Sequence, residues 1–340
     1  PFNGTPKSLM KTINRYSGIQ WANDEVAIAT DYWWNSRNTK VYLFNPSDPS
    51  LETEILYDLN YQDRYSDPGE PVMERNHWGR SVISINKNKI CLIGDGFTGE
   101  GQFPFLDEVD LKSKKTKRLY QSEYNDKLEN IGDYDAEKKQ LVVRIESPTE
   151  YPNYYIRDMK KGDLTRLSDF ENPFSSIQDV HKEVITYKSD DGLELSGTLY
   201  LPVGYDMAEK EKAPMILWAY PREFKDKSSA GQVTSNPNRF TYPYYGSAIY
   251  WVAKGYVVLD GAAFPIVGEG DEEPNDTFRK QLVGNARAAI DAVDELGYID
   301  RTKVAVGGHS YGAFMVANLI SHSNLFAAGI ARSGAYKRTL

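Results

Sequence analysis

The sequence predicts a chain in two parts: antiparallel β units repeated along residues 1–178, and a doubly wound, mostly parallel α/β sheet along residues 179–340. Two observations predict this division. A group of three short strands recurs in the first part, whereas apolar strands alternate with a helical pattern in the second. A third observation, a glycine-rich turn at Ser310 between a strand and a helix, places a candidate catalytic serine in the second part.

The composition excludes several classes of protein. Of 340 residues, 40% are hydrophobic and 26% are charged, which is ordinary for a globular protein with buried cores. A net charge of -8 argues against nucleic acid or an anionic membrane as a partner, and no apolar run approaches the roughly 20 residues that cross a bilayer. One cysteine, Cys91, and four histidines give no zinc-ligand spacing, so the sequence predicts no internal disulfide, no metal and no cofactor.

The repeated unit of the first part is an apolar strand, a second strand ending in Asn or Asp, and a short third strand. Its turn residues are Asn45, Asp110 and Asp158, separated by 65 and 48 residues, and their side chains suit a turn because they accept from nearby backbone amides. This spacing is near the period of propeller blades, so the repeats predict part of a β-propeller with about three blades. A plain β-sandwich is the alternative. The strands are expected at residues 26–29, 41–45 and 55–56, at 90–93, 108–112 and 118–119, and at 141–143, 155–159 and 166–167.

Three blades do not close a ring, since propellers use about four to eight. We therefore expect further blades before Pro1 in an intact protein. The chain shows no charged and apolar leader at its start, so the sequence leaves the compartment open.

The second part alternates strands and helices. Residues 183–187 and 195–201 flank the turn Asp190-Asp191-Gly192 and predict a hairpin. The uninterrupted apolar runs 215–219 and 256–260 are typical of buried parallel strands. Between Arg279 and Leu296 the apolar residues fall on one helical face, and Gly297 follows as a C-terminal cap. Residues 326–331 predict a further strand after the helix that follows Ser310.

The stretch from Val304 to Val306 is a short apolar strand, and Gly308-His309-Ser310-Tyr311-Gly312 matches the pattern G-x-S-x-G. In a nucleophile elbow the serine lies on a strained turn between a strand and a helix, and the flanking glycines are needed because a Cβ would strike the neighbouring backbone. Ser310 is therefore the candidate nucleophile. The alternative is an ordinary N-cap of the following helix.

Taken together, these signals resemble the prolyl oligopeptidase family of serine peptidases, and within it the glutamyl endopeptidase branch. The resemblance covers residues 179–340 well and the first part by repeat pattern only. It implies part of an α/β-hydrolase domain preceded by part of a β-propeller, and a peptidase that forms an acyl-enzyme on Ser310. The stretches that carry it are 219–225 (AYPREFK), 265–270 (PIVGEG), 307–315 (GGHSYGAFM) and 330–336 (IARSGAY).

The same resemblance assigns roles to residues near the serine. The amide of Tyr311 and the hydroxyl of Tyr220 are the expected oxyanion donors, with a packed aromatic as the alternative for Tyr220. Arg222 and Lys225 are candidates to bind a substrate carboxylate, which would suit a preference for Glu before the scissile bond. Solvated loop charges are the alternative for these two residues.

The triad partners depart from the family pattern. In this fold the order along the chain is Ser, then Asp or Glu, then His. His322 stands twelve residues after Ser310 along a helix, about 18 Å away, and His309 points away from Ser310 on the turn. Neither is therefore expected to act as the base. We expect the acid and the base beyond Leu340, and the chain as given to be inactive.

Three functions remain open from the sequence. The first is a serine peptidase acting on peptides; the second is an acylaminoacyl peptidase or esterase on the same scaffold; the third is a catalytically silent binding module. The resemblance implies an exported or plastid protein, and oligomeric state is left open.

Overall fold

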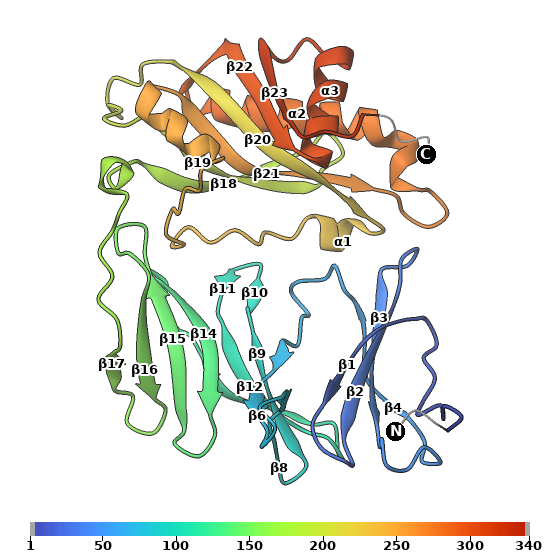
Figure 1. Cartoon of the computed structure of the whole chain (residues 1–340). Helices are drawn as coiled ribbons and strands as arrows, with labels where there is room; N and C mark the ends of the chain where they lie inside the picture. Colours follow the sequence, from blue (N-terminus) through green and yellow to red (C-terminus); the bar gives the residue numbers. More distant parts are fainter. Residues whose placement is uncertain (1–3, 337–340) are drawn as a thin grey trace.

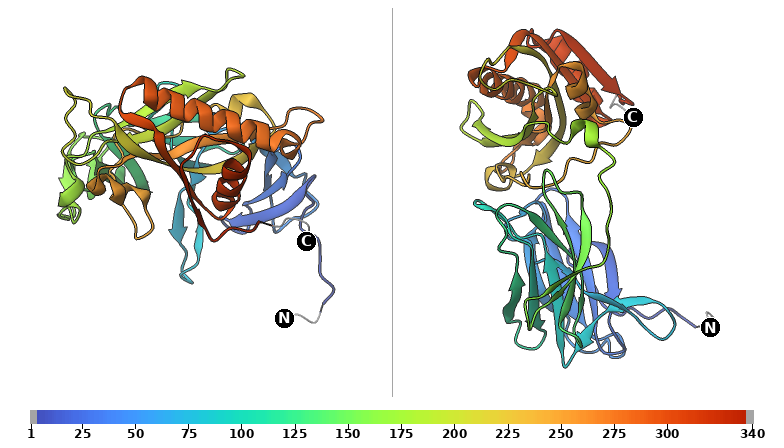
Figure 2. Two further views of the ribbon diagram at one scale, coloured as in Figure 1. Left: turned by 90° about the horizontal axis from the view of Figure 1, so that it is seen from above. Right: turned by 90° about the vertical axis from the view of Figure 1, so that its left-hand side faces the viewer.

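The computed structural model describes residues 4–336. These residues form two layers, with antiparallel sheets in one and a mixed sheet with helices in the other (Figure 1). The side view in Figure 2 shows the same two layers, joined by the segment that follows the third antiparallel sheet. Among the described residues no helix is both long and apolar enough to cross a membrane.

The first layer contains three antiparallel sheets, each with four strands side by side. The first sheet has the order β1 (Arg15–Trp21), β2 (Ala27–Trp33), β3 (Asn38–Phe44), β4 (Glu54–Asn60). The second has β5 (Glu70–Pro71), β9 (Lys89–Gly94), β12 (Phe105–Asp110), β13 (Thr116–Gln121), and β8 (Ile85–Asn86) also pairs with β9. The third has β14 (Leu128–Asp135), β15 (Gln140–Glu146), β16 (Asn153–Asp158), β17 (Leu164–Arg166). Two small hairpins are β6 (Met73–Arg75) with β7 (Ser81–Ile83), and β10 (Phe97–Thr98) with β11 (Gly101–Gln102).

The predicted repeat corresponds to the last three strands of each sheet, and its turns have one shared geometry. Oδ1 of Asn45 accepts from the amides two and three residues later, at 2.9 and 3.1 Å. Oδ1 of Asp110 accepts from the corresponding amides at 3.2 and 2.8 Å. Oδ1 of Asp158 does so at 2.9 and 3.1 Å. One side chain thus closes the same turn three times, which explains why the sequence keeps Asn or Asp there.

Apolar side chains hold the three sheets face to face. Between the first and second sheets lie Ile28, Ile90, Leu92 and Val109, all nearly inaccessible to solvent. Another cluster joins the second and third sheets; its members are Val72, Leu106, Ile131, Tyr134, Leu141, Val143 and Ile145. The sheets therefore form one continuous stack.

The second layer is a six-stranded sheet in the order β18-β19-β21-β20-β22-β23, antiparallel at β18 and β19 and parallel from β21 onward. Its strands are β18 (Lys182–Lys188), β19 (Glu194–Tyr200), β20 (Ala213–Phe224), β21 (Val257–Val267), β22 (Ile299–His309) and β23 (Ala328–Arg332). The helices are η1 (Ser175–Ile177), α1 (Lys227–Ala230), η2 (Ala248–Lys254), η3 (Pro274–Thr277), α2 (Phe278–Glu295) and α3 (Tyr311–His322). Helices thus alternate with the parallel strands of a mixed sheet.

Local predictions for this layer agree with the structure. The turn at Gly192, with φ +82°, closes the β18–β19 hairpin, and Gly297 follows α2 with φ +84°. Leu282, Ala286 and Val293 of α2 are fully buried against the sheet. Strands β20 and β21 extend to Phe224 and Val267, several residues beyond the predicted apolar runs.

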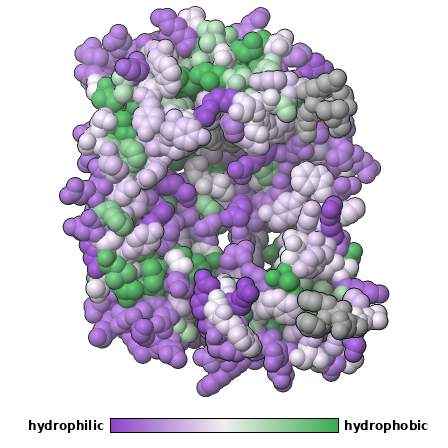
Figure 3. Space-filling model, in the orientation of Figure 1, coloured by the Kyte–Doolittle hydropathy of each residue, from purple (hydrophilic) through white to green (hydrophobic). Residues whose placement is uncertain are grey.

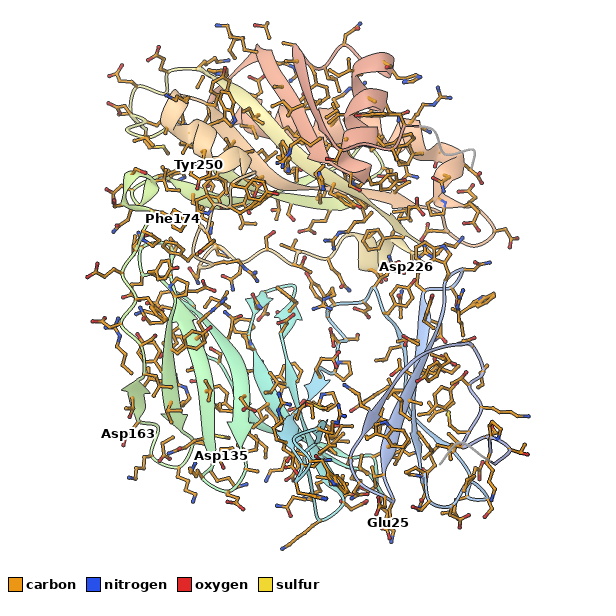
Figure 4. The ribbon with its side chains drawn as sticks, viewed as in Figure 1. Glu25, Asp135, Asp163, Phe174, Asp226 and Tyr250 are labelled. Atoms are coloured by element: carbon orange, nitrogen blue, oxygen red, sulfur yellow. The ribbon has the colours of Figure 1, made fainter. Side chains whose placement is uncertain are left out.

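Residues 226–247, which we call the strap, run between the two layers (Figures 1 and 4). At one end Asp226 accepts from Asn60 of the first sheet at 2.8 Å. Gln232 binds the loop after that sheet, accepting from the amide of Arg64 at 2.7 Å and donating to Asp63 at 2.6 Å. Burial acts to raise the pKa of Asp63, but hydrogen bonds, the one from Gln232 foremost, hold it below its ordinary value.

The strap then reaches the β10–β11 hairpin and the loops of the third sheet. Asn236 donates to Gln102 at 3.2 Å, and Asn238 donates to the carbonyl of Asn125 at 2.8 Å. Phe240 packs edge-on against Tyr151, with ring centroids 5.2 Å apart. The strap therefore couples the α/β layer to the first sheet, the β10–β11 hairpin and the third sheet. The surface is hollowed along the line where the layers meet (Figure 3).

Candidate active site

Ser310 lies on the sharp turn between β22 and α3. Its backbone has φ 57° and ψ -114°, a strained conformation for a residue with a side chain. Its N–H donates to the carbonyl of Arg332 on β23 at 2.9 Å, which ties the turn to the neighbouring strand. Ser310 stands at the N-cap position of α3, but its side chain caps no helix amide and is exposed. The hydroxyl is therefore presented to solvent at the carboxyl edge of the sheet.

Glycines around the serine allow the elbow to close. A Cβ on Gly308 would lie 2.6 Å from the carbonyl carbon and oxygen of Gly312. A Cβ on Gly312 would lie 2.8 Å from the carbonyl oxygen of Ala219, and one on Gly307 would lie 2.4 Å from the ring of Trp218. The two pattern glycines meet backbone atoms, which cannot rotate away as a side chain can. Both are needed for the strand, turn and helix to fit together.

Gly308→Ala is expected to lower the free energy of unfolding by ~1–3 kcal/mol, because the added methyl group overpacks backbone. Urea unfolding of both proteins measures the difference. Gly99→Ala is the matched control, since a Cβ there meets nothing within 4 Å. Equal stability of Gly308→Ala and the parent chain would contradict the clash.

Tyr220 lies beside the elbow, on the part of β20 that extends past its last pair with β22, Trp218 with Gly307. Its side chain is 49% exposed, and its ring lies edge-on to Tyr311 with centroids 6.1 Å apart. The structure thus brings Ser310, Tyr311 and Tyr220 together at one edge of the sheet. A hydroxyl and a backbone amide beside an exposed serine are the groups that an oxyanion site requires.

Tyr311 is anchored on its other side. Its hydroxyl donates to Oε1 of Glu223 at 2.9 Å, and its ring stacks on Phe278 and Phe314, with centroids 5.7 and 5.9 Å apart. Sequence reasoning assigned no role to Glu223. The sequence feature that could have pointed to Glu223 is its place three residues after Tyr220, near the end of the same strand.

The two cations predicted to bind substrate have different surroundings. Lys225 donates to the carbonyls of Gly270 and Glu272, at 3.1 and 2.6 Å, and its side chain is only 11% exposed. Its ammonium thus holds the loop after β21 and is not directed to a ligand. Arg222 is exposed on β20, two residues beyond Tyr220, and has no ion-pair partner among residues 4–336.

Neither candidate histidine contacts the serine. Nδ1 of His322 lies 2.9 Å from the carbonyl oxygen of Asn318, and its Nε2 lies 3.0 Å from Arg279, at the end of α3 far from the elbow. His309 is exposed at the end of β22. Within the described part of the chain no histidine hydrogen-bonds Ser310, and no group of three His, Cys, Asp or Glu side chains is arranged to hold a metal.

Comparison with known proteins gives a consistent result. The model of the prolyl oligopeptidase family matches residues 277–339, a range that contains α2, the elbow and α3. A protein of Oryza sativa subsp. japonica named "Probable glutamyl endopeptidase, chloroplastic" is 40% identical over 356 residues, covering 100% of this chain and 38% of the relative. A protein of the same name from Arabidopsis thaliana is 39% identical over 351 residues. This match covers 98% of this chain and 37% of the relative. The chain spans less than two-fifths of the length of these relatives.

A solved structure shares the fold at low sequence identity. Oligopeptidase B from Trypanosoma brucei, in a closed form with covalently bound antipain, superposes with a TM-score of 0.58 and 14% identity, covering 96% of this chain and 51% of that one. The shared fold extends over both layers of the described structure.

Proposed function

The chain belongs to the prolyl oligopeptidase family, and from this premise we propose that the whole protein is a serine peptidase that forms an acyl-enzyme on Ser310. The observation that carries the proposal is the elbow: an exposed serine with φ 57° at a strand-to-helix turn that only glycines can flank. The names of the plant relatives support a preference for peptides with Glu before the scissile bond.

In the proposed reaction Oγ of Ser310 attacks the scissile carbonyl carbon while a general base takes its proton. The amide of Tyr311 and the hydroxyl of Tyr220 donate to the oxygen that becomes negative. The proton then passes to the leaving amine as the carbon–nitrogen bond breaks. Water hydrolyses the acyl-enzyme in the second half of the reaction and restores the Ser310 hydroxyl.

The general base and its acid come from outside residues 4–336. Two observations support this assignment: His322 is bound to Asn318 and close to Arg279, and His309 makes no hydrogen bond to Ser310. The chain order Ser, acid, base of α/β hydrolases also favours a later position. Without those partners the described residues would supply only the nucleophile and the oxyanion donors.

Residues 1–178 are assigned as about three blades of a β-propeller, and residues 179–340 as the N-terminal part of the hydrolase domain. The repeated four-strand sheets, their Asn and Asp turns and their face-to-face packing support the first assignment. The strand order of the mixed sheet supports the second. Arg222 stays a candidate for substrate binding, and the word chloroplastic in the relatives' names is compatible with a plastid location.

Peptides that differ only in the residue before the scissile bond test the activity and the substrate class. The whole protein is expected to cleave a Glu peptide with at least about tenfold higher kcat/KM than its Gln analogue, because hydrogen bonds to a charged group contribute ~1.5–3 kcal/mol. Mass spectrometry of the products identifies the cleaved bond. Cleavage of N-acylated amino acids or esters alone would favour the acylaminoacyl peptidase or esterase, and absence of any hydrolysis would favour the silent binding module.

A further inference from the structure

Arg332 is a cationic residue whose backbone lies beside the elbow, at the end of the neighbouring strand. It is the last residue of β23, pairs with His309 of β22, and accepts the N–H of Ser310 on its own carbonyl at 2.9 Å. Its position is therefore determined by the same backbone hydrogen bonds that hold the elbow. Neither the sequence reasoning nor the proposed reaction gives this side chain a role.

The guanidinium of Arg332 contacts the backbone of the strap. Nη1 donates to the carbonyl of Gly246 at 2.8 Å. A Cβ on residue 246 would lie 2.4 Å from Nη1 and 2.8 Å from Nη2, and 2.9 Å from the ring of Tyr244. Only a glycine lets the guanidinium lie this close to the strap backbone, with an aromatic ring beside it.

The charge of Arg332 is not neutralised within the described chain. Among residues 4–336 its guanidinium makes the single hydrogen bond to Gly246 and no ion pair, although the side chain is partly exposed. A guanidinium has five N–H donors arranged to bind a carboxylate with two parallel hydrogen bonds. The N–H donors that Gly246 does not occupy can thus take a carboxylate from a bound peptide.

The surroundings suit an acidic side chain in particular. The chain has a net charge of -8, so an acidic substrate needs a local cation where it meets the protein. Tyr244 and Tyr245, next to Gly246 on the strap, are 53% and 94% exposed and pack edge-on with ring centroids 5.8 Å apart. Such rings offer apolar surface to the methylene groups of a glutamate while the guanidinium binds its carboxylate.

We propose that Arg332, seated on Gly246 of the strap, binds the carboxylate of the glutamyl side chain that precedes the scissile bond. This inference rests on the proposed peptidase function and deepens it by naming the residue that selects the substrate. Lys225 is excluded from this role because its ammonium is bound to loop carbonyls. Arg222 is the competing candidate, since it is exposed and has no ion-pair partner among residues 4–336, but no hydrogen bond there holds its guanidinium in place.

The experiment compares Arg332→Gln with Arg222→Gln in the whole protein. For each variant kcat/KM is measured on two peptides that differ only by Glu or Gln before the scissile bond, together with the rate at which a fluorophosphonate labels Ser310. Arg332→Gln is expected to lower the ratio of the Glu to the Gln peptide roughly 10- to 100-fold, the range for a hydrogen-bonded charge. Cleavage of the Gln peptide and labelling stay unchanged, and Arg222→Gln keeps the parent ratio.

Arg332→Lys is the second variant and decides the matter if the Gln variant does not fold. Lysine keeps the positive charge but cannot form two parallel hydrogen bonds to a carboxylate. The ratio of kcat/KM for the Glu and Gln peptides is therefore expected to lie between those of the parent and Arg332→Gln. An unchanged ratio in both Arg332 variants, or its loss in Arg222→Gln, would overturn the proposal. So would an equal fall in both peptides and in labelling, which would mean that Arg332 only positions the elbow. A parent protein that neither labels nor cleaves would instead refute the peptidase function itself.

Discussion

Ser310→Ala in the whole protein is expected to lower kcat for peptide hydrolysis by about a million-fold, the loss measured when the nucleophile of a serine peptidase is removed. The structure gives the reason. The side chain is exposed, caps no helix amide and lies on a strained turn that the flanking glycines make room for. Removing one oxygen therefore removes the atom that would be acylated. Hydrolysis of a Glu-containing peptide and covalent labelling by a fluorophosphonate measure the loss.

Ser333→Ala is the matched control for Ser310→Ala. Ser333 also has a positive φ, 52°, is exposed, and directly follows the strand that pairs with the elbow strand. It shares the chemistry and the backbone strain of Ser310 but lies outside the strand-to-helix turn. Activity is expected to stay near that of the parent. A Ser310→Ala protein that still labels at full stoichiometry would show that another residue is the nucleophile.

Local rules were enough to predict the repeated turns and the elbow. Asn45, Asp110 and Asp158 close turns with their own side chains, so their structure depends on a few adjacent residues. The first strand of each sheet was missed; the shortest of the three, β5, is only Glu70–Pro71 and carries no apolar pattern. Such a strand is defined by its neighbour β9, through pairs that lie more than twenty residues apart in the sequence.

The long end of β20 was also missed, for a related reason. Pro221 lacks an N–H and interrupts an apolar run, so the sequence indicates the end of a strand there. In the structure residues 219–224 still pair with 262–267 of β21, while β22 has no pair with β20 beyond Trp218. Pairing on one side tolerates the proline and carries Tyr220 and Glu223 to the elbow.

Contacts between distant residues could not be derived from periodicity at all. No structure was predicted for the strap, yet its polar side chains reach the first layer through hydrogen bonds between residues up to 169 positions apart. Arg332 meets Gly246 across 86 positions. The sequence therefore predicted the turn at Ser310 better than it predicted the contacts that surround that turn.

Tyr220→Phe is expected to lower kcat/KM about 10²- to 10³-fold, the loss of ~2.7–4 kcal/mol that follows removal of one oxyanion donor. The hydroxyl of Tyr220 makes no hydrogen bond among residues 4–336, and the ring contact with Tyr311 survives the substitution. Stability is therefore expected to stay unchanged. The loss lies mainly in kcat, because the donor acts on charge that develops in the transition state and not on the substrate carbonyl.

Tyr250→Phe separates this effect from general loss of a tyrosine hydroxyl. Tyr250 is 45% exposed, close to the 49% of Tyr220, but lies on η2, away from the elbow strand (Figure 4). Its variant is expected to retain the parent kcat. Labelling of Ser310 by a fluorophosphonate should slow in Tyr220→Phe alone, since the phosphonyl oxygen occupies the same site as the oxyanion. If both variants keep the parent rates, Tyr220 is a packed aromatic, and the second donor must come from elsewhere at the elbow.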